Sequence, residues 1–389
     1  MIKKVAVFTG TRAEYGLLYW LLKDIQSDVE LDLKLLVSGM HLSPEFGCTY
    51  TQIENDGFEI DEKIEILLSS DTAVGVAKSM GLGVLGFADA LDRLKADALV
   101  ILGDRFEALA AAQTAMILKI PIIHLHGGEL TEGAYDDAIR HSISKLSYLH
   151  ATSTEAYRKR VIQLGENPNR VKNVGAIGLD HLQRSEMLTL TQISESLGFQ
   201  LLKPYFLVTY HPVTLAHEDP VESFKALLNS IDSFPRHQVI ITYPNADDGG
   251  RKIISILEEY ANLNPVRVCA IKSLGQQRYL STVKHADVVI GNSSSGIIEV
   301  PSFNVPTVNI GMRQKGRLAA KSVLHCQADE ASITSAINNA VNRVYKTAGE
   351  RIINPYGAGD TSRKVINMIK SLDKAVMKTF YDITTDDLL

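Results

Sequence analysis

The segment Ala98–Glu107, ALVILGDRFE, contains the pattern that decides the fold. Apolar residues come first, and Gly103, Asp104 and Arg105 follow before a helix-periodic stretch begins. A strand that is apolar on both faces is typical of a parallel sheet covered by helices on both sides. Residues that follow such a strand lie at its carboxyl end, where open parallel sheets bind ligands. The segment therefore predicts an α/β fold and indicates where functional residues should be sought.

The same pattern continues along most of the chain, because short Val- and Ile-rich runs alternate with longer amphipathic stretches. The predicted strands are Val5–Phe8, Leu33–Val37, Ala98–Leu102, Ile120–Leu125, Leu149–Thr152, Phe206–Thr209, Val239–Thr242, Val288–Ile290 and Thr307–Ile310. The predicted helices include Glu14–Ile25, Thr72–Leu94, Phe106–Leu118, Glu155–Leu164 and Asp219–Phe234. This alternation predicts parallel sheets in α/β layers.

The length of 389 residues predicts two domains, because it exceeds the usual size of a single core. The first series of strands ends near residue 178, and a new strand begins at Phe206. We place the boundary within residues 178–200, which gives an N-terminal domain of residues 1–180 and a C-terminal domain of residues 181–360. The C-terminal helix 361–389 has no strand after it, and we expect it to join the N-terminal domain. The predicted fold is α/β, with two Rossmann-like domains facing a central cleft.

The composition excludes several classes of protein. A net charge of −5 argues against sequence-independent nucleic-acid binding, which needs a broad basic surface. Cys48, Cys269 and Cys326 form no CxxC pair, which is consistent with a reducing cytoplasm. The first residues, MIKKVAVFTG, favour a buried strand over a signal peptide, and no later run is long enough to span a bilayer. We expect a cytoplasmic protein with neither nucleic acid nor membrane as partner.

Asp104 directly follows the predicted strand Ala98–Leu102. An aspartate at this position commonly caps the next helix. It can equally act as a catalytic carboxylate base, in which case Arg105 beside it would lower its pKa and keep it ionised. The residues leave both roles open.

The segment His124–Glu129, HLHGGE, ends another predicted strand. Because side chains alternate along a strand, we expect His124 and His126 to point the same way. Such a pair can hold a transition metal if acids such as Glu129 complete the ligand set. The alternative is one buried structural histidine and one histidine at the site. The two glycines between them and Glu129 let the backbone approach a ligand closely.

A helix-periodic segment begins at Tyr135, and two acids lie at its start. Asp136 can cap this helix, but capping does not need the paired acids Asp136 and Asp137 beside Arg140 and His141. We interpret these residues as candidates for general acid and general base catalysis.

The turn Gly10–Gly16, GTRAEYG, opens a helix after the first strand. This turn lacks the dinucleotide spacing GxGxxG, and GxxxxGK[ST] occurs nowhere in the chain, so we expect no dinucleotide cofactor and no P-loop. Arg12 at the start of the helix suits a phosphate or a ribose, and pairing with a surface carboxylate is its alternative.

In the second half, several polar groups follow predicted strands. His211 and Asn245 each come after a strand. The segment Gly291–Gly296, GNSSSG, precedes a helix-like stretch and predicts an anion site suited to a diphosphate. Glu299 can accept hydrogen bonds from ribose hydroxyls, and the basic loop Gly311–Arg317 can neutralise phosphates.

With these segments assembled, the chain resembles the hydrolysing UDP-N-acetylglucosamine 2-epimerases of bacterial sialic- and legionaminic-acid pathways. The matching motifs occur in order along nearly the whole chain: GTRAEYG at 10–16, LVSGMH at 36–41, LGDRFEALA at 102–110, HLHGGE at 124–129, DDAIRHSISKLSYLH at 136–150, VIQLGE at 161–166, YHPVT at 210–214, GNSSSGIIEVPS at 291–302 and NIGMRQKGR at 309–317.

The resemblance implies a fold like that of the GT-B glycosyltransferases and a reaction in two stages without metal or cofactor. A base removes the C2 proton while UDP leaves C1, which gives a 2-acetamidoglucal. Water then adds at C1 and a proton returns to the opposite face of C2, which releases a free manno-configured sugar. The implied partner is a UDP-sugar.

The resemblance also implies roles for individual residues. The catalytic aspartates correspond to Asp104 and Asp136. The UDP ligands correspond to Arg12, Arg105, His211, Asn245, Ser293, Ser294, Glu299 and Arg313. The candidate catalytic set that we draw from the residues and the resemblance together is Asp104, His126, Glu129, Asp136 and His211, with no metal ligand.

The chain departs from many relatives at one position, because His126 replaces the glutamate of their HIEGGE motif. Another branch carries HIHGGE. Either His126 transfers the second proton, with a pKa suited to neutral pH, or Glu129 does.

Other functions fit the same motifs. The nearest alternative is the same reaction on UDP-2,4-diacetamido-2,4,6-trideoxyglucose, which leads to legionaminic-type acids. A non-hydrolysing epimerase, a GT-B glycosyltransferase, a nucleotide-sugar sensor and a zinc hydrolase are further alternatives. We expect a homodimer or higher homo-oligomer, for which the apolar segment Gly81–Leu91 offers an interface.

Overall fold

The computed structural model describes residues 2–68, 72–131, 135–212, 219–244, 250–342, 352–372 and 377–384. Contacts between Cα atoms divide the chain into two compact units. Unit 1 comprises Met1–Glu129, Tyr135–Gln183 and Tyr356–Leu389, and unit 2 comprises Leu130–Ala134 and Arg184–Pro355. The chain thus leaves unit 1 after Gln183 and returns to it at Tyr356.

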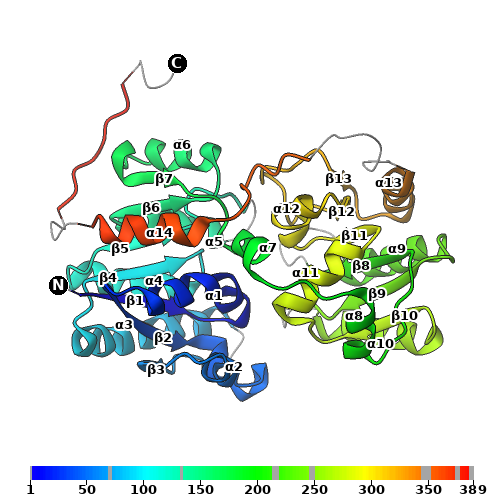
Figure 1. Ribbon diagram of the computed structural model, residues 1–389, viewed down its shortest axis with the longest axis horizontal. Coiled ribbons are helices and arrows are strands. Elements are labelled where there is room, and N and C mark those ends of the chain that lie inside the picture. The colour runs from blue at the N-terminus through cyan, green and yellow to red at the C-terminus, as the bar shows by residue number, and fades with distance from the viewer. Residues whose placement is uncertain are drawn as a thin grey trace. The chain divides into compact units, whose positions relative to one another are not determined.

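Unit 1 is built on a parallel seven-stranded sheet in the order β3-β2-β1-β4-β5-β6-β7 (Figure 1). In this sheet β1 lies between two parallel neighbours, so that Val5 pairs with Leu33 on one side and Ala98 on the other. The strands are β1 (Lys3–Thr9), β2 (Leu31–Ser38), β3 (Glu62–Ile64), β4 (Ala98–Leu102), β5 (Ile122–Leu125), β6 (Leu149–Thr152) and β7 (Val171–Asn173).

Helices cover both faces of this sheet. Apolar residues of α1 and α14 form the core on one face, and those of α3, α4 and α5 form the core on the other. The α helices of unit 1 are α1 (Arg12–Ser27), α2 (Tyr50–Asn55), α3 (Ala73–Leu94), α4 (Phe106–Ile117), α5 (Tyr135–Leu146), α6 (Glu155–Gln163) and α14 (Thr361–Lys370). The short 3₁₀ helices are η1 (Gly39–Leu42), η2 (Pro44–Phe46), η3 (Pro168–Arg170) and η4 (Ile177–Asp180), and α7 (His181–Arg184) contains the point where the chain leaves unit 1.

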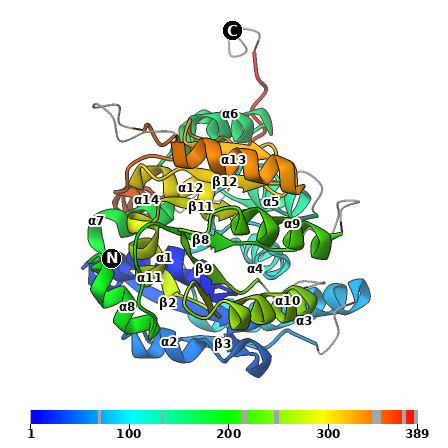
Figure 2. The ribbon, with the colours of Figure 1, turned by 90° about the vertical axis from the view of Figure 1, so that its right-hand side faces the viewer.

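Unit 2 repeats the plan with a parallel six-stranded sheet in the order β10-β9-β8-β11-β12-β13. Its strands are β8 (Tyr205–Thr209), β9 (Gln238–Thr242), β10 (Val268–Ile271), β11 (Val288–Gly291), β12 (Thr307–Ile310) and β13 (Val323–Cys326). Helices α9 (Pro220–Asp232) and α13 (Glu330–Asn342) pack together on one face with α10 (Gly250–Leu263), as Figure 2 shows. The other face carries α8 (Leu190–Leu197) and α11 (Gly275–His285), while α12 (Ser295–Ile298) and η5 (Val300–Phe303) connect β11 to β12.

The predicted α/β class with parallel sheets is confirmed, and the first six strands of each unit follow the Rossmann order 3-2-1-4-5-6. Every predicted strand is present, and four strands were not predicted: β3, β7, β10 and β13. All four are edge strands, and each has partly or fully exposed residues. Polar residues interrupt the apolar run in β3, β7 and β13, which is why the sequence pattern missed these three; β10 is apolar, and its sequence does not explain why it was missed.

The C-terminal segment differs from the predicted helix 361–389. Helix α14 ends at Lys370, and residues 377–384 are not helical. In this segment Lys378 Nζ donates to both carboxylate oxygens of Glu166 at 2.9 Å, and the Tyr381 N–H donates to the Gly165 carbonyl at 3.0 Å. These long-range contacts within unit 1 replace the local hydrogen bonds that helix periodicity predicts.

Helix α3 corrects the expectation that no run is long enough for a bilayer. Among the described residues it is the one helix that could cross a membrane by length and composition, and 33% of its most apolar window is buried. Phe87, Ala90 and Leu91 pack into the core beneath the sheet, and α3 lies against α4. Part of its apolar surface therefore belongs to the α/β layer.

Candidate active site

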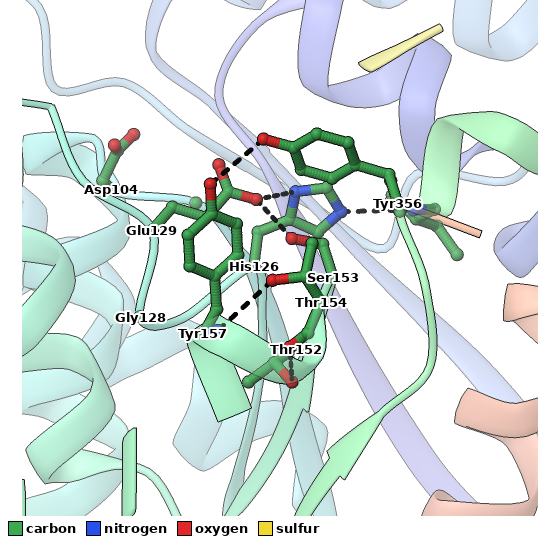
Figure 3. A network of polar contacts seen from close by, with 12 residues as sticks. Asp104, His126, Gly128, Glu129, Thr152, Ser153, Thr154, Tyr157 and Tyr356 are labelled. Carbon is green, nitrogen blue, oxygen red and sulfur yellow. Dashed lines mark hydrogen bonds and ion pairs between the residues drawn. The ribbon is translucent and has the colours of Figure 1, made fainter. Parts of the chain in front are cut away.

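The carboxyl ends of β4, β5 and β6 bring together the polar residues of unit 1. Asp104 follows β4, His126 and Glu129 follow β5, and Ser153 follows β6. Figure 3 shows Glu129 beside His126 and Ser153, and Tyr157 beside Tyr356. Because adjacent parallel strands end at the same edge of the sheet, residues far apart in the sequence meet here.

His124 is a buried structural histidine. Its Nε2 lies 2.8 Å from the Gly103 carbonyl oxygen, and its Nδ1 lies 3.1 Å from the Ser144 hydroxyl. Because a carbonyl only accepts, Nε2 carries the proton and Nδ1 accepts from Ser144. Burial lowers the pKa of His124 to about 3, so the ring is neutral at physiological pH.

The sequence predicted that strand alternation would make His126 point the same way as His124. This prediction is wrong. Strand β5 ends at Leu125, and His126 has φ +64°, in the left-handed region. Its Nδ1 lies 3.0 Å from Glu129 Oε1, and the Ile177 N–H donates to its Nε2 at 3.1 Å. Non-glycine residues rarely adopt this backbone conformation, and it turns the imidazole toward Glu129.

Glu129 is buried and accepts a second hydrogen bond at the same oxygen. The Ser153 hydroxyl donates to Glu129 Oε1 at 2.7 Å. Nearby, the hydroxyls of Tyr157 and Tyr356 lie 3.0 Å apart, although these residues are far apart in the chain. The carboxylate is therefore held by donors from two loops of unit 1.

The two glycines of HLHGGE serve packing within the protein. A Cβ at Gly127 would come within 2.8 Å of Ser144 Oγ, and one at Gly128 within 2.5 Å of the Tyr157 carbonyl oxygen. The Cβ directions of the two glycines are filled by α5 and α6, so packing within the protein is by itself a reason for both, and the close approach to a ligand stays a prediction.

Asp104 pairs with Arg140 rather than with its neighbour Arg105. Arg140 is buried, its Nη2 contacts Asp104 Oδ2, and its Nη1 donates to the Glu129 carbonyl at 2.9 Å. Asp104 does not cap α4, because Arg105 occupies the N-cap position and no side chain caps that helix. Arg140 thus connects the loop after β4 to the loop after β5.

Arg105 forms a two-point ion pair with buried Glu107, with Nε 3.1 Å from Oε2 and Nη2 3.0 Å from Oε1. The guanidinium of Arg105 thus turns toward Glu107, and the expected effect of Arg105 on the pKa of Asp104 stays a prediction. Glu14 also interacts electrostatically with Arg105. Burial raises the pKa of Glu14 to about 7, although Arg105 acts to lower it.

Arg12 occupies the first turn of α1 and is exposed. Thr11 and Glu14 form a capping box there, in which Glu14 Oε2 accepts the N–H groups of Gly10 and Thr11 at 2.8 and 3.1 Å. This box fixes the turn that presents Arg12.

Asp136 and Asp137 lie in the first turn of α5, where the helix dipole favours negative charge. Asp137 lies 3.4 Å from Arg140 Nη1 and 3.3 Å from His141 Nε2. The start of α5 therefore adds the carboxylate of Asp137 to the pair of Asp104 and Arg140.

In unit 2, Asn292 connects the carboxyl ends of β8, β11 and β12. Its side chain accepts the His211 N–H and donates to the His211 carbonyl, both at 2.8 Å. Its own carbonyl accepts from Arg313 Nη1 and Gln314 Nε2, both at 3.0 Å. Burial, with a smaller effect from Arg313, lowers the pKa of His211 to about 3, so His211 is a neutral hydrogen-bonding group.

The serine-rich loop directly precedes a helix, as the sequence predicted, and the anion site itself stays a prediction. Ser293 and Ser294 come just before α12, which is a single turn. Glu299 is buried directly after that turn. Asn245 lies outside the described residues.

All ring nitrogens of His124 and His126 contact protein groups. These contacts argue against the hypothesis that the two histidines bind zinc. Within the described ranges, no group of three or more His, Cys, Asp or Glu side chains is arranged to hold a metal ion.

Sequence reasoning did not select Ser153, Asn292 or Gln314 as site residues, and it named Arg140 without a role. A signal existed for each. Ser153 directly follows β6, and Asn292 and Gln314 lie inside motifs that follow β11 and β12. The sequence did not show which group each of these side chains would contact in the folded protein.

Comparison with known proteins places these residues in a family context. Residues 23–370 match the UDP-N-acetylglucosamine 2-epimerase family. A Campylobacter jejuni protein named GDP/UDP-N,N'-diacetylbacillosamine 2-epimerase (hydrolyzing) is 44% identical, over 84% of this chain and 85% of its own. The Escherichia coli polysialic acid biosynthesis protein P7 is 37% identical, over 98% of both chains.

The fold also has counterparts among solved structures. The crystal structure of UDP-GlcNAc 2-epimerase from Neisseria meningitidis bound to UDP-GlcNAc superimposes with a TM-score of 0.80 at 18% identity, over 95% of this chain and 100% of that one. The GT-B-like fold implied by the motifs is thereby confirmed. The chain belongs to the UDP-N-acetylglucosamine 2-epimerase family, as a hydrolysing nucleotide-sugar 2-epimerase.

Proposed function

We propose that this protein eliminates UDP from UDP-N-acetylglucosamine and hydrates the resulting 2-acetamidoglucal, giving N-acetylmannosamine and UDP. The observation that carries the proposal is the convergence of Asp104, Arg140 and the His126–Glu129 pair at one sheet edge. Carboxylates at such an edge suit the removal of a proton from carbon and its return. The product would feed sialic-acid-type surface sugars.

Asp104 is the base of the first stage in this proposal. It takes the C2 proton, the C–H electron pair forms the C1–C2 double bond, and UDP leaves with the electrons of the C1–O bond. Asp136 is the second catalytic aspartate implied by the family motif. In unit 2, the groups proposed for UDP are His211, Ser293, Ser294, Glu299 and Arg313, with Asn245 from the motif; Arg12 and Arg105 would add cationic groups from unit 1.

The second candidate substrate is UDP-N,N'-diacetylbacillosamine, with release of 2,4-diacetamido-2,4,6-trideoxymannose. The observation that favours it is the 44% identity with the Campylobacter jejuni protein named for that sugar. Both substrates carry the 2-acetamido group and the UDP that the two stages require. We place the enzyme in the cytoplasm, in line with its three free cysteines.

The test is incubation with each UDP-sugar in D₂O. We expect free UDP and a manno sugar carrying deuterium at C2 from at least one of them, and the faster of the two identifies the substrate. Asp104→Asn should lower kcat by about 10³-fold or more while the Kd for UDP changes less than about threefold, because Asn keeps the shape beside Arg140 but cannot take a proton. Product that still carries UDP, or no product from either sugar, would sink the assignment.

A further inference from the structure

Both ring nitrogens of His126 are engaged inside unit 1. The Ile177 N–H donates to Nε2 at 3.1 Å, and Nδ1 lies 3.0 Å from Glu129 Oε1. A backbone N–H can only donate, so Nε2 must present its lone pair. A neutral imidazole carries one proton, which then sits on Nδ1 and is donated to Glu129. The two neighbours together select the Nδ1–H tautomer.

The Ile177 N–H is held firmly in place. The neighbouring Ala176 N–H donates to the Tyr356 carbonyl at 2.9 Å, and the Thr361 hydroxyl is 3.3 Å from the Ala176 carbonyl. At the other end of η4, the buried Asp180 accepts the N–H groups of Thr361 and Ser362, both at 2.7 Å. The donor to His126 therefore belongs to a segment fastened on both sides to the start of α14.

Glu129 receives two donors at one oxygen. The Nδ1–H of His126 and the hydroxyl of Ser153 both point to Oε1, at 3.0 and 2.7 Å. Hydrogen bonds from two fixed groups hold a carboxyl group in one orientation, as the partners of catalytic groups do. The carbonyl oxygen of a protonated Glu129 would accept the same two bonds, so the arrangement serves either protonation state.

We propose that His126 is a positioning residue that orients Glu129, and that Glu129 moves the second proton. The inference rests on the proposed function for its chemical step. In the hydration stage, the Glu129 carboxyl group gives its proton to C2, a water oxygen bonds to C1, and the proton that this water loses restores Glu129. The stage consumes one water and no net proton. His126 keeps its single proton on Nδ1 throughout.

The first test reads the tautomer directly and needs no turnover. Long-range ¹H–¹⁵N spectra of the full-length protein, labelled at histidine, are compared with those of His126→Asn to assign His126 among the 11 histidines. We expect a protonated Nδ1 and an unprotonated Nε2 at pH 7.5. A proton on Nε2 overturns the proposal, whether or not the enzyme turns over either sugar.

The second test separates positioning from proton transfer. Asn suits the left-handed backbone at position 126, and its amide can donate to Glu129, but it cannot exchange a proton. We expect His126→Asn to keep at least a tenth of kcat, His126→Ala to fall clearly below it, and Glu129→Gln to lose about 10²- to 10⁴-fold. The proposal is overturned if the kcat of His126→Asn is as low as that of Glu129→Gln. It is also overturned if the kcat of Glu129→Gln is within tenfold of the wild-type value.

A third variant removes only the donor. Ile177→Pro deletes the N–H at the first position of η4, where proline is tolerated, and Ala176 before it has φ −77° and ψ 130°, which proline accepts in its predecessor. Ile177→Val is the matched control, because it trims the side chain and keeps the N–H. We expect Ile177→Pro to mix the two tautomers of His126 and lower kcat, and Ile177→Val to change neither the tautomer nor kcat by more than twofold. If Ile177→Pro folds and the His126 signal is unchanged, the conclusion that the Ile177 N–H selects the tautomer is overturned. If this variant does not fold, the first two tests decide.

A wild-type protein that releases no UDP from either sugar refutes the proposed function. The tautomer measurement then still tests whether the geometry selects the Nδ1–H form. The two failures are therefore distinguishable.

Discussion

Gly103 and Gly128 have almost the same φ, +79° and +81°, in two loops of the candidate site. Their surroundings differ. A Cβ at Gly103 would meet nothing within 4 Å, whereas one at Gly128 would lie 2.5 Å from the Tyr157 carbonyl oxygen. The pair therefore separates the cost of a left-handed backbone from the cost of a steric clash.

We expect Gly103→Ala to destabilise the protein by about 1 kcal/mol, the usual cost of a left-handed conformation for a residue with a Cβ. Gly128→Ala should cost about 2 kcal/mol more, because backbone atoms of α6 must also move. Urea unfolding of both variants measures the difference. Equal losses of stability would show that the loop after β5 relaxes freely.

At the scale of elements, Glu166 connects helix α5, strand β6 and the C-terminal segment. Its buried carboxylate lies 2.6 Å from Lys145 Nζ, 3.1 Å from His150 Nε2 and 2.9 Å from Lys378 Nζ. Burial alone would raise the pKa of Glu166, but hydrogen bonds from His150, Lys145 and Lys378 outweigh it and lower the pKa to about 2. The last described residues of the chain are thus fastened to the helix that carries Asp136.

This shift predicts how stability depends on pH. A carboxyl group whose pKa is lower in the folded state stabilises the protein above its unfolded pKa of about 4.3, and the contribution is lost as pH falls toward 2. Glu166→Gln should therefore lower the free energy of unfolding at pH 7 by on the order of 3 kcal/mol, and the difference from wild type should shrink below pH 4.

Glu155→Gln is the control for this prediction, since Glu155 forms an exposed pair with Arg158 at 3.0 Å, and such pairs contribute little. Urea unfolding at pH 7 and pH 3.5 checks both variants. A Glu166→Gln protein as stable as Glu155→Gln at pH 7 would contradict the ion cluster as a stabilising element.

At the scale of the whole molecule, the face of α3 away from the core leaves apolar side chains exposed. Leu85 is 68% exposed and Leu82, one turn before it, is 40% exposed. Both residues lie within Gly81–Leu91, the part of α3 proposed from the sequence for self-association. Apolar side chains gathered on one helix face favour association, whereas a single exposed apolar residue does not.

We expect the wild-type protein to sediment as a dimer or larger oligomer at micromolar concentration, and Leu85→Lys to shift it toward monomer. Val29→Lys is the matched control, because Val29 is 87% exposed in the turn after α1 and away from α3. Sedimentation velocity measures all three proteins. A monomeric wild type, or equal behaviour of the two lysine variants, would refute the interface.

The sequence determined the elements whose signal is local. Central strands such as β4 are buried on both faces, so their composition alone predicts them, and the residues that follow them identify the candidate site. The motifs were likewise sufficient to identify the family. Edge strands such as β3 could not be predicted in this way, because pairing along one side stabilises them without a continuous apolar run.

The tertiary structure alone decided which groups are partners. Arg105 is adjacent to Asp104 in sequence, yet Asp104 pairs with Arg140 from α5, and Arg105 pairs with Glu107. His126 follows a strand, yet its left-handed backbone and the distant Ile177 N–H set its orientation and its tautomer. The physical reason is that hydrogen bonds and ion pairs depend on distances that folding creates between remote segments, whereas apolar periodicity records only the face that each segment buries.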